Sequence, residues 1–148
     1  MRGSLFSAKA EYACIAMLEL AARHGDPAPA RLKAIAEGHG IPKRFLVQIL
    51  LQLKGAGLIA STRGAAGGYH LARPPKAISL AEVIGVIDRS DKPADLRSGN
   101  GRGHSPLVRA IHDVWSEIIE AQKHILESTS LADLLHRAQG AYDLVYHI

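Results

Sequence analysis

The sequence predicts a mainly α-helical protein with one small β-hairpin, followed by a long helix. Apolar residues recur at helical spacing over residues 41–55, a strand–glycine turn–strand pattern occupies residues 58–71, and an amphipathic stretch covers residues 106–128. A shorter helical stretch, residues 31–37, precedes the first of these. Two short helices joined by a tight turn and followed by a hairpin form a winged helix-turn-helix, which we predict here.

The first helix is predicted from Ser7, whose side chain suits a helix cap, to about His24, where Gly25 ends it. Residues 12–22 are nearly all apolar. Because a helix that is apolar on most sides avoids water, we expect this helix to be well buried.

Two further helices follow, joined by Gly-His-Gly at residues 38–40. The first covers residues 31–37, and the second opens at Ile41-Pro42. A proline suits the first helical position because its φ is preset and the amide it lacks would have no helical partner. The buried stripe of the second helix is Phe45, Leu46, Ile49, Leu50 and Leu53. Its outward face carries Lys43, Arg44, Val47 and Gln48.

Residues 58–62 and 69–71 are predicted as the two strands of the hairpin. The turn between them, Arg-Gly-Ala-Ala-Gly-Gly at residues 63–68, needs glycine because some of its positions take a positive φ. Arg63 at the base of this turn, like the outward donors of the preceding helix, suits phosphate oxygens and base edges. The helix and the hairpin together therefore predict a nucleic-acid-binding surface.

The second half of the chain has a different pattern. Ser79 caps a helix that ends near residues 88–90, and residues 91–105 form a polar, glycine-rich loop. Pro106 starts the longest helix, which reaches about Ser128. Further on, the sequence predicts a short capped helix and an apolar tail.

The longest helix carries an apolar stripe that a small N-terminal domain cannot cover over its full length. We expect a second copy of the chain to cover it, and the alternative is that the helix folds back over the N-terminal domain. The predicted dimer seam is Leu107, Ile111, Val114, Trp115, Ile118, Ile119 and Ile125. Beyond it, Ser130 caps a helix over residues 131–139, and the tail, residues 141–148, is apolar enough to be expected to pack against the protein.

Charge is unevenly distributed along the chain. Residues 1–76 hold eleven Lys and Arg against four Asp and Glu, a net +7, whereas residues 77–148 hold seven against ten, a net −3. The basic half is the half with the winged-helix pattern, which is typical of a protein that binds a polyanion. A chance excess of solvated charge is the alternative. We predict a DNA-binding domain over residues 1–76 and a connecting helix, loop, dimerisation helix and short terminal helix over residues 77–148.

Several classes of protein find no support in the sequence. No apolar run is long enough to cross a bilayer and the start lacks the apolar core of a secretory signal, so we expect a soluble cytoplasmic protein. Cys14 is the one cysteine, which excludes an internal disulfide, and the eight histidines have no metal-ligand spacing. We therefore expect neither a metal nor a cofactor. With no nucleophile–base pair, paired carboxylates or phosphate-binding loop, we do not expect an enzyme.

With these elements in view, the chain resembles the Rrf2 family of bacterial winged-helix transcription factors over about residues 5–135. Four stretches carry the resemblance, and the wing is the most specific of them. They are Lys9-Ala10-Glu11-Tyr12-Ala13; Ile41-Pro42 with Phe45-Leu46 and Gln48-Ile49-Leu50; Gly57-Leu58-Ile59 with Ser61, Arg63-Gly64, Gly67-Gly68-Tyr69 and Leu71; and Ser130-Leu131-Ala132-Asp133-Leu134.

The resemblance implies a homodimeric transcriptional regulator, expected to be a repressor, that binds a roughly palindromic operator in double-stranded DNA. Each recognition helix would enter the major groove, each wing would point toward the minor groove, and the long helices would pair. Several members bind an iron–sulfur cluster through three cysteines in the loop before the long helix. That loop, residues 91–105 here, has no cysteine, and His104 and His112 are the only conceivable ligands nearby. We therefore do not extend the cluster to this chain.

Residues expected to contact DNA come from the recognition helix, the wing and the first helix. A glutamine such as Gln48 suits adenine, whereas Val47, at a position often acidic in relatives, offers only apolar contact, for instance to a thymine methyl. Tyr69 has two interpretations, a ring packed under the wing and a hydroxyl that reaches a phosphate. The predicted set is Lys9, Lys43, Arg44, Gln48, Ser61, Arg63, Gly64, Gly67, Gly68 and Tyr69.

Two alternatives stand beside a cofactor-free DNA-binding regulator. A winged-helix scaffold would bind protein instead, although the basic face argues against it. The second alternative is a regulator that responds to a small ligand bound near the dimer seam. In that case Trp115 would stack on the ligand. The sequence does not identify the class of that ligand. Cys14 is interpreted as a small buried hydrophobe, with a redox role as the alternative.

Overall fold

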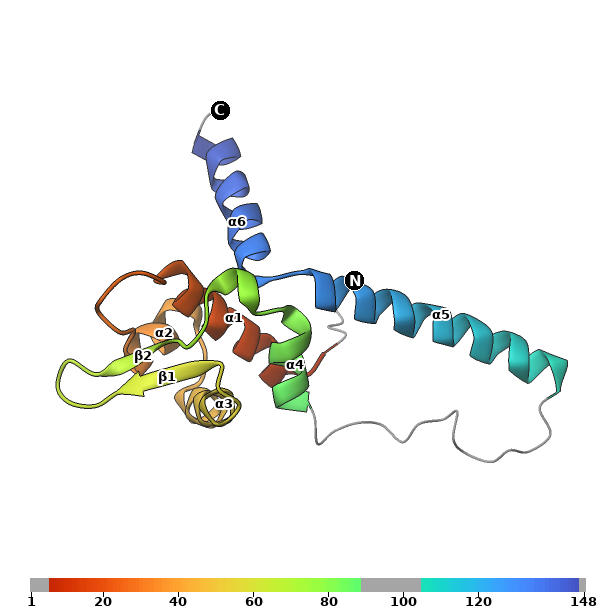
Figure 1. Cartoon of the computed structure of the whole chain (residues 1–148), viewed down its shortest axis with the longest axis horizontal. Coiled ribbons are helices and arrows are strands. Elements are labelled where there is room, and N and C mark those ends of the chain that lie inside the picture. Colours follow the sequence, from red (N-terminus) through yellow and green to blue (C-terminus); the bar gives the residue numbers. More distant parts are fainter. Residues whose placement is uncertain (1–5, 89–104, 147–148) are drawn as a thin grey trace.

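A computed structural model describes residues 6–88 and 105–146, the last six of them as backbone. It confirms a mainly helical fold with one antiparallel hairpin (Figure 1). In chain order the elements are α1 (Ala8–Ala22), α2 (Leu32–His39), α3 (Lys43–Gly55), β1 (Ile59–Thr62), β2 (Gly68–Leu71), the 3-10 turn η1 (Pro75–Ala77), α4 (Leu80–Asp88), α5 (Pro106–Ser128) and α6 (Leu131–Tyr146). Within the described residues, no helix is both long and apolar enough to cross a bilayer.

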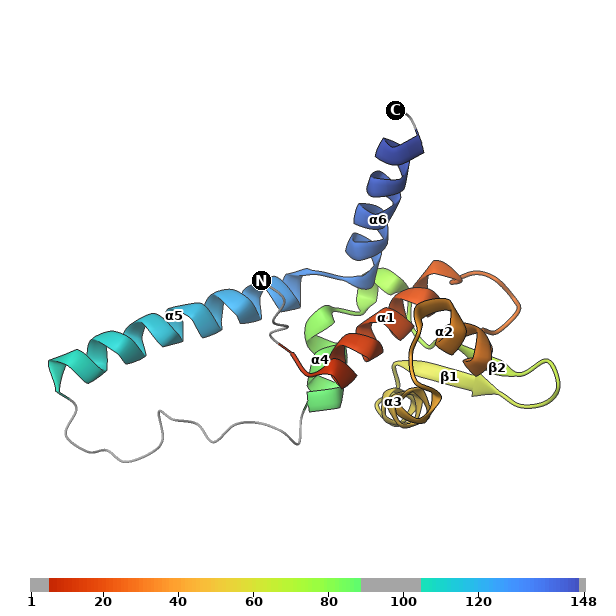
Figure 2. The same ribbon diagram turned by 180° about the vertical axis from the view of Figure 1, so that it is seen from behind.

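Helices α1 to α4 and the hairpin form one body around a single hydrophobic core. Helix α1 lies in its middle and contacts α2, α3, α4, β2 and α6 (Figures 1 and 2). Ala10, Ala13 and Ala16 are fully buried, and their small side chains allow neighbouring helices to approach closely. The large buried side chains that surround them include Met17, Leu20, Ile35, Leu46, Ile49, Leu50, Leu53, Ile78 and Val83. The predicted burial of the first helix is therefore confirmed.

Ala30, in the loop before helix α2, pairs with the outer edge of the hairpin. Strands β1 and β2 pair antiparallel, with Ile59 opposite Leu71. On the far side of β2, the Ala30 amide donates to the Tyr69 carbonyl at 2.9 Å and the Tyr69 amide donates to the Ala30 carbonyl at 2.8 Å. An isolated antiparallel β-bridge at Ala30 therefore extends the wing beyond β2, which the sequence pattern did not predict.

Helix α5 projects from the body as an arm, and α6 starts at the body beside the base of this arm and points away from it (Figures 1 and 2). The base is held by two backbone hydrogen bonds. The Leu80 amide donates to the Thr129 carbonyl at 2.9 Å, and the Leu131 amide donates to the Ile78 carbonyl at 3.0 Å. Leu131 is fully buried, so the chain re-enters the core directly after the arm.

The three predicted serine caps are all present. Ser7 Oγ accepts a hydrogen bond from the amide three residues on, at 3.1 Å. Ser79 and Glu82 form a reciprocal capping box, as do Ser130 and Asp133. Hydrogen bonds donated by the backbone and side chain of Ser130 hold the pKa of the Asp133 carboxyl below its usual range.

Two boundaries in the helix-turn-helix differ slightly from prediction. Pro42 takes the cap position, with φ −59° and ψ 129°, and the helix begins one residue later. Helix α2 continues through Gly38 and ends at His39, because the next residue, Gly40, takes a left-handed φ of 63° and caps it. The turn therefore covers residues 40–42, two positions later than predicted and of the same length.

The end of the chain differs more from prediction. Helix α6 was expected to end near Gln139, but it runs to Tyr146 and accommodates Gly140 in its interior. The predicted packing of the tail side chains lies outside the described residues, as does the predicted loop except for its last residue, Ser105.

Candidate nucleic-acid interface

Helix α3 buries one face and leaves the other open. Lys43, Arg44 and Gln48 are exposed, and Val47 is 44% exposed beside them. Leu51, which the sequence analysis did not assign, extends this face and is 65% exposed. The predicted recognition residues therefore share one accessible surface of donors and apolar groups, the mixture that base edges in a major groove require.

Two aromatic rings orient Arg44. Its guanidinium carbon lies 5.1 Å from the centroid of the Phe45 ring, which is cation–π geometry. Phe45 in turn packs against Tyr12 of α1, with ring centroids 6.3 Å apart. The direction of this cation therefore depends on packing between α1 and α3, which helical periodicity does not reveal.

The wing turn needs its glycines for two different reasons. Gly64 has a φ of +106°, so it is required for backbone conformation, as predicted. Gly67 and Gly68 have no such φ. A Cβ on Gly67 would overlap the carbonyl oxygen of Thr62, and one on Gly68 would overlap that of Ala30. These two glycines are therefore required for the close approach of neighbouring backbone.

A hollow of about 430 Å³, which we call the wing hollow, lies between the wing and the start of α2. Arg31 and Arg63 line it together with the Ser61 and Thr62 side chains and the backbone of the glycine turn, and no acidic residue lines it. The Arg31 guanidinium donates a hydrogen bond to the carbonyl oxygen of Ala65, at 2.5 Å. The sequence analysis missed Arg31 because it lies outside the wing and recognition-helix motifs.

The remaining predicted residues occupy less open positions. The Tyr69 ring is half-buried and packs against the core, which agrees with the first of its two interpretations. Ser61 is half-buried in β1, and Lys9 is half-buried in the first turn of α1. Helix α3 contacts β1 of the wing, whereas Lys9 belongs to a separate element, α1.

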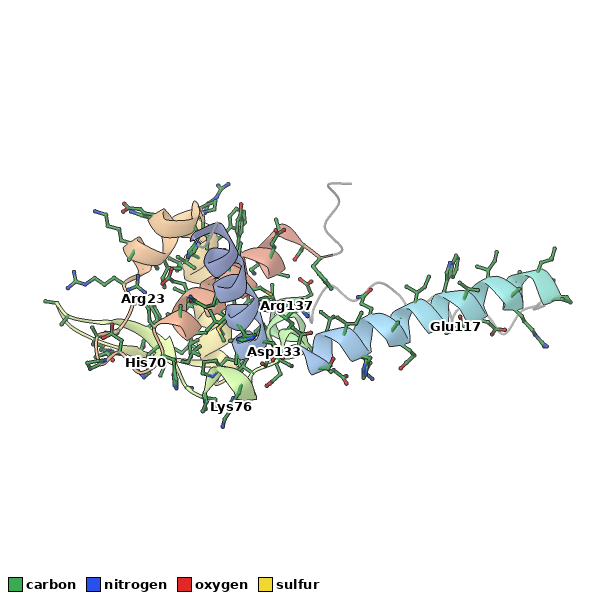
Figure 3. The ribbon with its side chains drawn as sticks, turned by 90° about the horizontal axis from the view of Figure 1, so that it is seen from above. Arg23, His70, Lys76, Glu117, Asp133 and Arg137 are labelled. Atoms are coloured by element: carbon green, nitrogen blue, oxygen red, sulfur yellow. The ribbon has the colours of Figure 1, made fainter. Side chains whose placement is uncertain are left out.

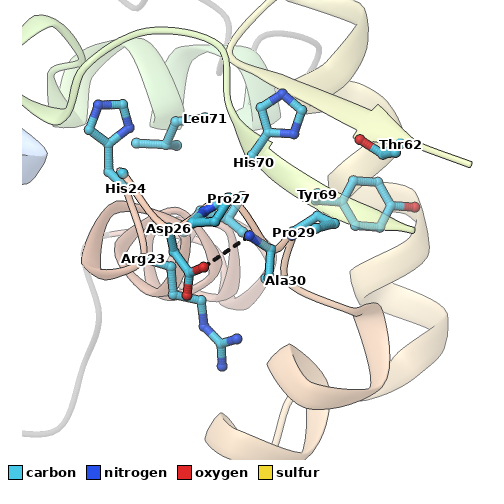
Figure 4. Close-up of a pocket in the computed structure, with 13 residues that line it drawn as sticks. Arg23, His24, Asp26, Pro27, Pro29, Ala30, Thr62, Tyr69, His70 and Leu71 are labelled. Carbon is cyan, nitrogen blue, oxygen red and sulfur yellow. Dashed lines mark hydrogen bonds between the residues drawn. The ribbon is translucent and has the colours of Figure 1, made fainter. Parts of the chain in front are cut away.

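A second pocket, of about 260 Å³, lies between the α1–α2 turn and β2. Figure 4 shows His24 at one end and Tyr69 and Thr62 at the other. Asp26 shapes the turn by accepting a hydrogen bond from the Ala28 amide at 2.9 Å. No predicted function falls on this pocket.

The apolar stripe of α5 is uncovered. None of the 23 residues of α5 is buried, and the helix does not fold back over the body. Figure 3 shows its side chains, Glu117 among them, standing clear of the body. The predicted seam residues are 48% to 78% exposed; they are Leu107, Ile111, Val114, Trp115, Ile118, Ile119 and Ile125.

Cys14 of α1 is half-buried in the body. Burial, with smaller contributions from the Asp88 and Glu11 carboxylates, raises the pKa of its thiol to about 11. At neutral pH almost none of this thiol is ionised, and the thiolate is the reactive form. The structure therefore supports the interpretation of Cys14 as a small hydrophobe.

A helix-turn-helix with an exposed cationic face, a wing beside it and a projecting helix define the class of winged-helix DNA-binding regulators. Comparison with known proteins specifies the family. The profile of the Rrf2 family, described as an iron-dependent transcriptional regulator, matches residues 6–137. The chain belongs to the Rrf2 family, whose named members are DNA-binding transcriptional regulators and not enzymes.

Similar proteins are found among both sequences and solved structures. The regulator CymR of Bacillus subtilis is 35% identical over 134 residues, covering 90% of this chain and 91% of CymR. The regulator IscR of Vibrio cholerae is 34% identical over 131 residues, covering 87% of this chain and 73% of IscR. The structure of T. potens IscR matches with a TM-score of 0.77 at 35% identity, covering 94% of this chain and 91% of that one. The structure of B. subtilis CymR, titled the global cysteine regulator, matches with a TM-score of 0.75 at 35% identity, covering 89% and 96%.

The residues of this chain do not fit the iron that the family description implies. An iron–sulfur cluster is held by several thiolates. The sequence has one cysteine, Cys14, and its thiol is half-buried and protonated at neutral pH. Across residues 6–88 and 105–140, no three His, Cys, Asp or Glu side chains are grouped to hold a metal ion. His112 is half-buried on α5, and His104 lies outside the described residues.

Proposed function

We propose that this protein is a homodimeric repressor that binds a palindromic operator in double-stranded DNA without an iron–sulfur cluster. The uncovered stripe of α5 is the observation that supports it most. A second α5 laid along the first would remove side chains such as Trp115 and Ile118 from water in both copies at once. The twofold axis would then repeat α3 and the wing, and a palindrome is the operator that matches such symmetry.

In this proposal the exposed face of α3 reads bases. Lys43 and Arg44 lie in the first turn of the helix, the part that reaches base edges in helix-turn-helix complexes. Gln48 would pair with adenine, and Val47 would contact a thymine methyl. Arg44 enters the groove already oriented by the Phe45 ring.

The wing would hold the DNA backbone. Arg63 supplies a cation to phosphate or the minor groove, and Ser61 supplies a hydroxyl. Gly64, Gly67 and Gly68 keep the turn free of side chains, so its amides can approach phosphate. Lys9 and the Tyr69 hydroxyl would add contacts to phosphate at the edge of this surface. A dimer bound across a promoter would block RNA polymerase, so we favour repression over activation. We expect the protein to act in the cytoplasm.

The dimer is tested with one substitution on the stripe and one on the opposite face of α5. Ile118→Asp places a charge in the seam, and Arg109→Asp places the same side chain on the polar face. We expect Ile118→Asp to be monomeric in light scattering and to lose roughly 10²- to 10⁴-fold in operator affinity, the usual gain from linking two binding modules. Arg109→Asp should remain dimeric. A wild-type monomer at the micromolar concentrations used would contradict the proposal.

Selection of bound DNA from a random pool tests the operator. We expect an inverted repeat whose half-sites lie about 10–10.5 bp apart or a multiple of that. Gln48→Ala should cost about 1–3 kcal/mol at one base pair of each half-site and little elsewhere. Arg63→Ala should weaken binding to all sequences equally. A selected pool without a repeat would overturn the palindromic operator.

A further inference from the structure

The wing hollow concentrates positive charge that the body leaves unpaired. Arg23 pairs with Glu19 at 2.6 Å, and Arg73 pairs with Glu82 at 2.5 Å. Arg31, by contrast, forms no ion pair with any described residue, and its guanidinium is exposed. The same holds for Arg63. Two unpaired guanidinium groups at a hollow without carboxylates favour an anion there.

The shape of the hollow is set by backbone. The two hydrogen bonds between Ala30 and Tyr69 fix β2 beside the start of α2. Gly68 permits this approach, because a Cβ there would overlap the Ala30 carbonyl. The wing is therefore held in place by contacts that do not involve the Arg31 side chain.

Arg31 is an unusual residue for its position. It is the cap of α2, with an extended backbone at φ −80° and ψ 143°, and its side chain makes no capping hydrogen bond. Ser, Thr, Asp or Asn would cap this helix better. Instead the side chain reaches to the wing and donates to the Ala65 carbonyl. That bond uses one of the five N–H donors of a guanidinium, so the group is oriented and still has donors to offer.

We propose that Arg31 binds a phosphate of the DNA backbone in the wing hollow, opposite Arg63. The proposal rests on the proposed function, because it assigns a further DNA-contacting residue to the same surface. A guanidinium binds phosphate oxygens with two parallel donors, which suits a phosphodiester that lies between two such groups. The contact is independent of sequence, so it fixes the register of the wing and leaves base selection to α3.

The test uses three variants of the full chain. Arg31→Ser removes the guanidinium and supplies a good helix cap, so α2 should remain intact. Arg31→Lys keeps the charge but not the paired donors. Arg109→Gln removes one positive charge from the start of α5, far from the wing in Figure 1, and serves as the matched control. Affinity for the selected operator and for unrelated duplex DNA is measured between 50 and 200 mM salt, roughly the range over which phosphate contacts dominate.

We expect Arg31→Ser to lose roughly ten-fold or more in affinity for both DNAs alike. The slope of log affinity against log salt should fall by about one for each protomer bound. Arg31→Lys should keep the slope and lose part of the affinity, and Arg109→Gln should match wild type. Circular dichroism and thermal unfolding confirm that each variant is folded.

Three results would overturn the assignment. They are an unchanged affinity in Arg31→Ser, a loss of affinity at an unchanged salt slope, and a loss confined to the operator. The second result would mean that Arg31 only supports the wing. A wild-type chain that binds no DNA would instead overturn the proposed function and this proposal together, so the two failures are distinguishable.

Discussion

The body and the arm satisfy the same need to bury apolar surface in different ways. In the body, α1, α3 and α4 share one core, and side chains such as Met17, Leu46 and Ile49 are fully buried. In the arm, α5 carries as strong an apolar stripe and buries none of it. The body thus buries its apolar side chains within its own core, whereas the apolar stripe of α5 stays exposed in a single chain. This difference between the two regions is what the proposed pairing of two α5 helices would account for.

Placing one substitution in both regions tests this difference with the largest expected effect. Ile49→Asp puts a carboxylate into the fully buried face of α3, and Ile118→Asp puts one onto the half-exposed stripe of α5. Burying an unpaired charge in a closed core costs several kcal/mol, about as much as the whole stability of a small domain. We expect Ile49→Asp to abolish cooperative unfolding in denaturant titrations followed by circular dichroism.

Ile118→Asp should retain a cooperative transition, because the core of the body is untouched. Its unfolding midpoint should not depend on protein concentration. The midpoint of the wild type should rise with concentration, because association stabilises the folded state. A variant of Ile118 that fails to fold even at high concentration would mean that the body depends on the arm, contrary to the division drawn here. Ile49→Val, which keeps the site apolar, controls for mere loss of volume at Ile49 and should cost about 0.5–1.5 kcal/mol.

Burial in the body also has a signature in pH. The Cys14 thiol has its pKa raised to about 11 in the folded protein by burial and by Asp88 and Glu11, against 9.0 for an ordinary cysteine. The folded state therefore binds this proton more tightly than the unfolded state does. The stabilisation it gives is complete below about pH 9 and is lost as the pH rises toward 11.

We expect that loss to be on the order of 2 kcal/mol in urea titrations of the wild type between pH 8 and 11. Other groups titrate in this range, so the informative quantity is the difference from Cys14→Ala, which lacks the thiol. The free energy of unfolding of the wild type should fall relative to that of Cys14→Ala as the pH rises. A difference in unfolding free energy that stays constant from pH 8 to 11 would mean that folding does not raise the pKa of the thiol.

Much of the fold could be predicted from the sequence because its signals are local. Ser7, Ser79 and Ser130 each cap the helix that directly follows them. The periodicity of α3 assigned its buried and open faces correctly. The predicted end of α6 near Gln139 was wrong, since the helix continues through Gly140 to Tyr146. A glycine disfavours a helix interior by only about 1 kcal/mol relative to alanine, which its neighbours can offset.

The parts of the site that depend on distant contacts could not be predicted. Arg31 and Ala65 are 34 residues apart, and the Ala30–Tyr69 bridge joins a loop to a strand across a helix-turn-helix. No periodicity or motif records either contact. Gly68 was predicted in the turn, but it begins β2, where a Cβ would overlap the Ala30 carbonyl. Sequence patterns thus located the wing and the recognition helix, while the arrangement of cations around them required coordinates.

The smallest expected effect compares one ion pair in each region. In the body, Glu19 of α1 accepts from Arg23 at 2.6 Å and lies 2.8 Å from His39 Nε2 at the end of α2. The hydrogen bond from Arg23, supported by His39 and opposed by burial, holds the pKa of Glu19 below its usual range. In the arm, Lys123 and Glu127 are 4.0 Å apart on one exposed helix.

Because the pKa of Glu19 is lowered on folding, its stabilisation is present above the usual glutamate pKa and is lost as the pH falls through the lowered value. Glu19→Gln should cost less than about 1 kcal/mol at pH 7, since the group is partly exposed, and this cost should shrink as the pH falls below the usual glutamate pKa. Glu127→Gln should leave the unfolding of the body unchanged over the same pH range. Equal effects of the two variants in urea titrations would contradict the distinction, because Glu19 joins two elements of a folded body whereas Glu127 joins only successive turns of one helix.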